Sequence, residues 1–69
     1  MEFKEKAKIR IEHWMRHTDD HVTEYEQFAD ELEHAGYGDA ADNIREMAAI
    51  TSKCTQCLNN ALLSVDEGP

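Results

Sequence analysis

Two short groups of side chains in this sequence have the types and spacings of metal ligands. His17 and His21 are four residues apart, and Cys54 and Cys57 are three residues apart. Residues with these separations lie on the same face of a helix. Two imidazoles and two thiolates are the ligand set of a closed, tetrahedral zinc site, for which nickel and cobalt are the next candidates. The sequence therefore predicts a structural metal site built from these four residues.

A second ligand set uses the histidines without the cysteines. His13, His17 and His21 recur every four residues, and Glu24 follows within one turn. These side chains would bind a divalent ion at the surface of one helix or across a dimer. The alternative to both sets is a metal-free helix pair. In that case His21 hydrogen-bonds to polar neighbours in the core and the cysteines pack as small apolar side chains.

The residues that would position these ligands form an all-α, antiparallel two-helix hairpin. Gly36-Tyr37-Gly38-Asp39 is the only strong turn signal in the chain. Gly36 suits the left-handed position that ends a helix, and Asp39 suits the N-cap of the next. We expect one domain over 1–69, with helices over about 3–35 and 40–64, a turn at 36–39 and a frayed tail at 65–69.

Apolar residues on both sides of the turn follow a heptad repeat. In the first helix the predicted seam consists of Ile11, Trp14, Thr18, His21, Tyr25, Phe28, Leu32 and Ala35. In the second it consists of Ile44, Met47, Thr51, Cys54, Leu58, Ala61 and Val65. A second row lies beside each seam: Met15, Val22 and Ala29, and Ala41, Ala48 and Leu62. The repeat passes Thr18 without a change of phase, which predicts one continuous first helix.

The hairpin brings the two ligand pairs to the same depth. Antiparallel helices pair residues equally far from the turn, so His21 falls near Cys54 and His17 near Cys57. The apolar stripe is wider than two helices need, which predicts a homodimer that forms a four-helix bundle. An antiparallel dimer would set the basic start of one copy against the acidic stretch of the other, although the sequence leaves the orientation open.

Composition excludes several classes of function. The formal net charge of −8 argues against a nucleic-acid partner, because binding to a polyanion requires a basic surface. No apolar run approaches the ~20 residues of a membrane helix, and the N-terminus has no signal-peptide pattern, so we expect a cytoplasmic, acidic protein. The sequence has no nucleophile–base pair, phosphate loop or cofactor motif, so we do not expect an enzyme.

Residues 11–21, with the pattern H-W-x-x-H-x-x-x-H, resemble a group of small prokaryotic helical proteins of unknown function. The Ala-rich segment 40–49 is similar to the start of their second helix. Members occur alone or attached to His-rich segments of metal-related proteins, so the resemblance implies divalent-metal binding at His13, His17 and His21. The pair Cys54 and Cys57 lies outside the common pattern.

These observations predict a small metal-binding helical protein with a structural or carrier role. The alternative is a metal-free helical module for dimerisation or for interaction with another protein. The sequence does not identify the metal, the pathway or a partner other than a second copy.

Overall fold

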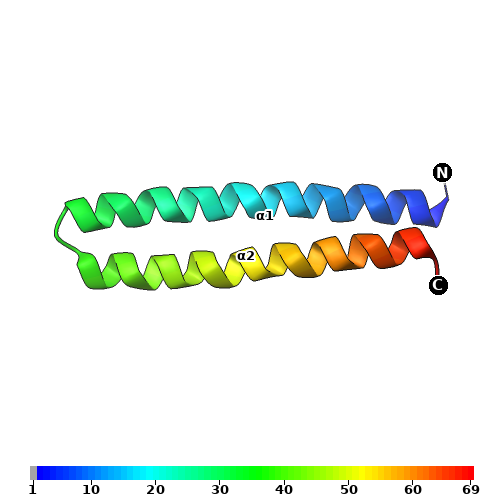
Figure 1. Ribbon diagram of the computed structural model, residues 1–69. Coiled ribbons are helices and arrows are strands. Elements are labelled where there is room, and N and C mark those ends of the chain that lie inside the picture. The colour runs from blue at the N-terminus through cyan, green and yellow to red at the C-terminus, as the bar shows by residue number, and fades with distance from the viewer. Residues whose placement is uncertain (1) are drawn as a thin grey trace.

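The structure, a computed structural model, describes residues 2–69 and consists of two long helices. Helix α1 spans Phe3–His34 and helix α2 spans Gly38–Glu67. They run antiparallel and in contact along their whole length, and both termini lie at the end opposite the turn (Figure 1). The molecule measures 51 × 17 × 9 Å. The predicted all-α hairpin is confirmed, and α1 passes Thr18 without a break.

A Schellman motif ends α1 and turns the chain. Gly36 has a φ of +93°, which confirms the predicted left-handed residue. The Gly36 N–H donates to the Glu33 carbonyl at 3.1 Å, and the Tyr37 N–H donates to the Leu32 carbonyl at 2.9 Å. These two bonds satisfy carbonyl groups that the helix end would otherwise leave without a partner.

Helix α2 is longer than expected at both ends. It begins at Gly38 with Tyr37 as the N-cap residue, so Asp39 lies in the first turn rather than at the cap. There its carboxylate stands near the positive end of the helix dipole. The helix also continues through the segment expected to fray, up to Glu67. Lys8 and Lys4 hold this end, because Lys8 Nζ lies 2.8 Å from Asp66 Oδ1 and Lys4 Nζ donates to the Asp66 carbonyl at 3.0 Å.

The helices pack along the second apolar row rather than along the whole of the predicted seam. Trp14 and Phe28 were expected in the core but are 51% and 50% exposed, and Cys54 is exposed as well. The inward-facing residues of α1, buried or half-buried, include Ile11, Met15, Thr18, Val22, Tyr25, Ala29 and Leu32, and His21, also half-buried, lies beside them. Those of α2 are Ala41, Ile44, Ala48, Thr51, Thr55, Leu58, Leu62 and Val65. Every second residue of each predicted seam thus stays inward-facing while the second row largely replaces the others, so both helices are rotated from the predicted orientation.

Three alanines account for this rotation. Ala29, Ala41 and Ala48 are the fully buried apolar residues, and no larger side chain within 2–69 is fully buried. Alanine has no atoms beyond Cβ, so two helices that meet through it approach closely. The indole of Trp14 or the ring of Phe28 in the same place would hold the backbones apart. The three alanines therefore face the partner helix, and Trp14 and Phe28 lie at the edge of the contact.

Candidate metal centre

Three histidines follow one another along α1 on successive turns. The rings of His17 and His21 meet edge to face, with centroids 4.4 Å apart and an interplanar angle of 86°. His21 Nε2 lies 3.0 Å from His17 Nε2. His13 stacks on His17 with centroids 6.2 Å apart and an interplanar angle of 14°. The i, i+4 spacing thus brings His17 and His21 together through their Nε2 atoms and adds His13 as a stacked neighbour.

The other nitrogen of His21 has a carboxylate beside it. His21 Nδ1 lies 3.4 Å from Glu24 Oε2, and the imidazole stacks on Tyr25 with centroids 5.9 Å apart. A carboxylate at Nδ1 favours the tautomer that carries its proton there. Nε2 then keeps its lone pair on the side that faces His17. Glu24 and Tyr25 therefore orient this imidazole.

The separation of the two Nε2 atoms suits an ion held by both imidazoles. Metal–nitrogen bonds of about 2.0–2.1 Å to two atoms this far apart subtend an angle of about 95° at the ion. This angle is close to that of an octahedral or square arrangement, and a small side-chain rotation reaches the tetrahedral one. Without an ion, the same contact is a hydrogen bond from one neutral imidazole to the other.

The cysteines lie on α2 and are exposed, unbridged thiols. The structure therefore brings together two of the four residues of the predicted zinc set, His17 and His21, and leaves Cys54 and Cys57 on the neighbouring helix. Within the described residues, no three His, Cys, Asp or Glu side chains are grouped as they would be around an ion. His34 is separate from the other histidines, since its Nδ1 donates to the Asp30 carbonyl at 2.7 Å.

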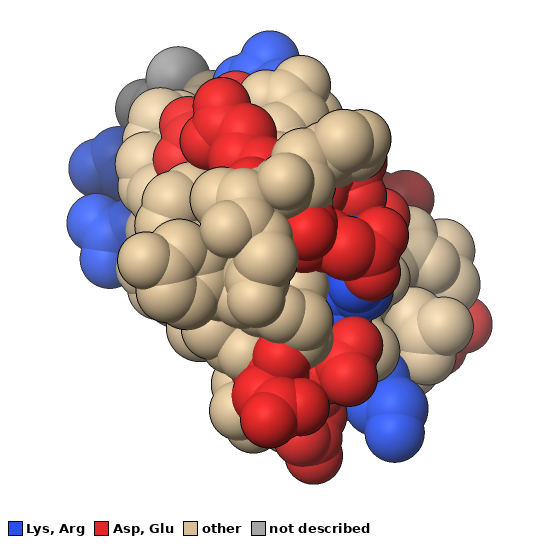
Figure 2. Space-filling view, turned by 90° about the vertical axis from the view of Figure 1, so that its left-hand side faces the viewer, with Lys and Arg blue, Asp and Glu red and all other residues tan. Residues whose placement is uncertain are grey.

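Ion pairs connect the helices on one side of the hairpin, which we call the bridged side. Arg45 Nη1 lies 3.0 Å from Glu33 Oε1, and its Nη2 lies 3.0 Å from Asp30 Oδ1. The pair of Lys8 and Asp66 closes the same side near the termini. Figure 2, seen from the turn end, shows a basic group between acidic side chains to the right of centre, and mostly uncharged residues to the left of centre, with basic groups at the far left edge.

These contacts also shift acid–base equilibria. Hydrogen bonds to Glu33 and Asp30 raise the pKa of the Arg45 guanidinium above its usual value. The hydrogen bond from Lys8 lowers the pKa of the Asp66 carboxyl, and the same bond raises the pKa of Lys8. The charged forms of Arg45, Lys8 and Asp66 are therefore favoured in the folded chain.

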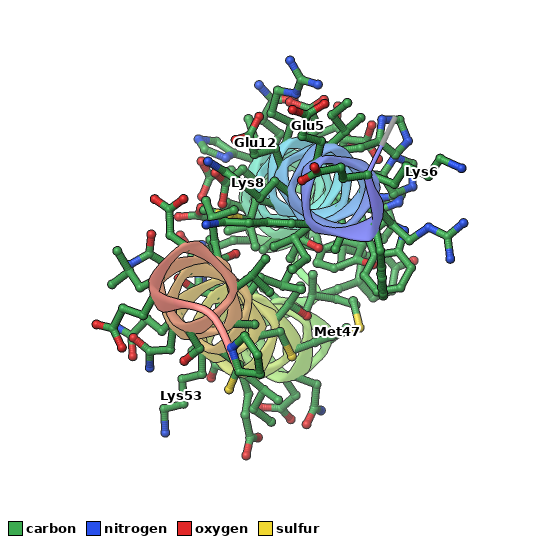
Figure 3. All side chains as sticks on the ribbon, turned by 90° about the vertical axis from the view of Figure 1, so that its right-hand side faces the viewer. Glu5, Lys6, Lys8, Glu12, Met47 and Lys53 are labelled. Atoms are coloured by element: carbon green, nitrogen blue, oxygen red, sulfur yellow. The ribbon has the colours of Figure 1, made fainter. Side chains whose placement is uncertain are left out.

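The opposite side, which we call the open face, carries the histidines and cysteines. It consists of Trp14, His21 and Phe28 on α1 and of Met47, Cys54 and Ala61 on α2, with members of each row seven residues apart. In an antiparallel pair these two rows flank the same side of the seam. Lys8 and Met47 point to opposite sides of the hairpin (Figure 3). The large apolar side chains of this face are thus left without a partner helix.

A groove near the termini confirms that the two rows share this side. It is lined by Phe3 and Ala7 of α1 together with Ser64 of α2 and Gly68, which follows the end of that helix. Ala7 continues the row of Trp14, and Ser64 lies one turn beyond Ala61 on α2. His17 and Cys57 lie beside these rows, one heptad position further out. All four residues of the predicted zinc set therefore belong to the same side of the molecule.

The sequence interpretation missed two features of this arrangement. Trp14 was placed in the core rather than on the open face, and Arg45 was not recognised as the residue that bridges the helices. Arg45 could have been found from the hairpin itself, because it lies as far from the turn as Asp30 does. A base opposite an acid at equal distance from the turn predicts an ion pair across the seam.

Neither helix of the described chain is long and apolar enough to cross a bilayer. The comparison with curated proteins found no match, and neither did the comparison with solved structures. One family model does match: that of the "Domain of unknown function (DUF8180)" covers residues 7–65, which include both histidine and cysteine pairs. The chain therefore belongs to the DUF8180 family.

Proposed function

We propose that the protein binds a divalent transition-metal ion through His17 and His21, in a structural or carrier role. The observation that supports this most directly is the 3.0 Å separation of the two Nε2 atoms. Two imidazoles one helical turn apart, here exposed His17 and half-buried His21, have many rotamers that separate them. Here they converge on a distance that one ion can span with ordinary bond lengths. Zinc, nickel and cobalt are the candidate ions, because imidazole suits all three.

Glu24 supports the same assignment from the outer side of His21. Histidine ligands of metals usually donate their second ring N–H to a carboxylate, a carbonyl or water, which fixes the ring and raises its basicity. Glu24 Oε2 stands in that place, 3.4 Å from Nδ1. We therefore assign Glu24 an orienting role and not the role of a fourth ligand that the set His13, His17, His21 and Glu24 would require.

His13, Cys54 and Cys57 are the side chains that could add to the pair. His13 stacks on His17, and a rotation of its ring would be needed to aim a nitrogen at the same ion. The two thiols lie on the same side of the hairpin but on α2. The set of His17, His21, Cys54 and Cys57 therefore remains the alternative to a site made by α1 alone.

Calorimetric titration of zinc and nickel into protein purified without an affinity tag tests the proposal. His17→Ala and His21→Ala should each weaken binding more than tenfold, since losing an outer-shell partner alone typically costs 10–100-fold. His34→Ala is the matched control and should bind as the unmodified protein does, because its imidazole is held by the Asp30 carbonyl. Binding should also weaken between about pH 7.5 and about pH 5.5, because protons compete with metal for imidazole.

Unchanged affinity in both histidine variants would show that the pair is not a metal site. Cys54→Ala and Cys57→Ala decide between the ligand sets. A loss comparable to that of the histidine variants assigns the thiols to the site, whereas unchanged affinity assigns it to α1.

A metal-free dimerisation or protein-interaction module is the second candidate, and the composition of the core supports it. The described hairpin buries only alanines fully, while Trp14, Phe28, Met47 and Ile50 remain exposed. A homodimer that packs two open faces together would form a four-helix bundle and cover these side chains. Dimers that persist in chelator, together with no measurable metal affinity, would favour this function over the first.

A further inference from the structure

We infer that two copies of this chain share one metal site, formed by His17 and His21 of each copy. The site lies on a two-fold axis that runs perpendicular to the helices, at the level midway between these two residues. This inference rests on the proposed metal-binding function and names the partner that completes the site. One hairpin places two imidazole nitrogens together, whereas a closed zinc site takes four ligands. The second copy supplies the missing two.

The position of the ligand pairs along the hairpin is the first support. Thr55 Oγ1 donates to Asp19 Oδ1 at 3.1 Å, which shows that residues 19 and 55 lie at the same level. Position 19 is midway between His17 and His21, and position 55 lies between Cys54 and Cys57. Both pairs are therefore centred on one level, and that level is close to the middle of α1 and of α2.

The open face is the second support, because it leaves one side of the seam available to another helix pair. Ion pairs occupy the bridged side. The open face instead presents Trp14 and Phe28 at half exposure, with Ile50 at its edge 58% exposed. These side chains lie on both sides of the histidine level, so a partner that covers them must also cover His17 and His21.

The distribution of charge along α1 favours a second copy of the chain as the partner on the open face, in the antiparallel orientation. Residues 3–17 of α1 contain five basic and two acidic side chains, whereas residues 18–34 contain seven acidic side chains and no Lys or Arg. Two α1 helices side by side and antiparallel bring each basic half against an acidic half. Parallel helices would bring like charges together, which costs energy at an interface.

Symmetry then determines which residues meet. In a two-fold interface, residue i of one copy contacts residue j of the other, and j contacts i in return. With the axis crossing α1 at position 19, His17 of each copy faces His21 of the other. The two His17–His21 pairs thus enclose the axis with four Nε2 atoms. By the same rule Cys54 of each copy faces Cys57 of the other on α2, at the same level.

The ratio of bound zinc to protein, measured by equilibrium dialysis and paired with sedimentation in the same buffer, tests this arrangement. We expect one tightly bound ion per two chains and a dimer of about twice the 7.9 kDa chain mass. Ile50→Glu should abolish the dimer and weaken zinc binding at least tenfold without touching a ligand. Leu63→Glu is the matched control, since Leu63 lies on the same helix with 55% exposure but on the bridged side. It should change neither property.

Circular dichroism verifies that each variant is helical, and Trp14→Glu repeats the test from α1 if Ile50→Glu unfolds the chain. One tightly bound ion per chain, or zinc affinity that survives loss of the dimer, would overturn the shared site and leave the proposed function intact. If the unmodified chain binds neither zinc nor nickel nor cobalt under these conditions, the proposed function itself fails.

Discussion

The two sides of the hairpin connect the same helices by different chemistry. On the bridged side Arg45, Lys8, Asp66 and Thr55 reach across the seam through charged or polar contacts whose side chains remain partly exposed to water. On the open face the large side chains are apolar and project past the seam instead of crossing it. Contacts of the first kind are complete within one chain. Those of the second kind gain most of their free energy only when another surface covers them.

This difference predicts that the two sides contribute unequally to stability. Exposed ion pairs contribute little to stability because water and salt screen them. Trp14 and Phe28 on the open face still have about half of their apolar surface to bury, and burial of such surface is strongly favourable. Three changes, from the largest expected effect to the smallest, test this division.

Trp14→Ala should have the largest effect. A fully buried tryptophan loses 3–5 kcal/mol on truncation, and the half-exposed Trp14 should lose about half of this, about 2 kcal/mol in the free energy of unfolding. Chemical denaturation followed by circular dichroism measures it. The loss should grow with protein concentration if a second copy covers the indole. A loss as small as that of a surface substitution would show that the open face adds no stability.

Arg45→Gln should have a smaller effect that depends on salt. The substitution removes the charge that connects α2 to Glu33 and Asp30, so the melting temperature should fall at low ionic strength. In about 1 M salt the Debye length shrinks to about 3 Å, and the difference from the unmodified protein should largely vanish. A difference that is equal at both salt concentrations would mean that Arg45 acts through packing of its stem instead.

Asp66→Asn should have the smallest effect, and only above a certain pH. Lys8 lowers the pKa of the Asp66 carboxyl in the folded chain, so the pair stabilises the fold above the pKa of the unfolded carboxyl. That contribution disappears as the pH falls through the lowered folded value. Thermal melts should therefore separate the variant from the unmodified protein near neutral pH and converge in strong acid. Curves that stay apart at about pH 2 would contradict this account.

The fold could be predicted because local signals agree with one another. Gly36 requires a positive φ, the heptad continues through Thr18, and no proline interrupts either helix, so the hairpin and its turn follow from short-range physics. The end of α2 could not be predicted in this way. It is held by Lys4 and Lys8, residues that are far from Asp66 in sequence and adjacent only in the folded hairpin.

The rotation of the helices was the main feature that periodicity did not determine. Three neighbouring apolar rows allow the seam to include either Trp14 and Phe28 or Met15 and Ala29, and hydrophobicity alone favours the larger side chains. Packing favours the smaller ones, because Ala29 lets the backbones approach. The same ambiguity limited the prediction of the candidate site to the residues of α1. The spacing of His17 and His21 predicted their convergence, while the place of Cys54 depended on the rotation.

The buried alanines also bear on conformational entropy. A large side chain that becomes fixed in a core loses rotamer freedom worth up to about 2 kcal/mol, whereas alanine has no such freedom to lose. Ala29, Ala41 and Ala48 therefore fix the spacing of the helices near the turn at almost no entropic cost. The side chains that still have rotamers to lose, Trp14 and Phe28 among them, stand on the open face and keep that freedom until another surface covers them.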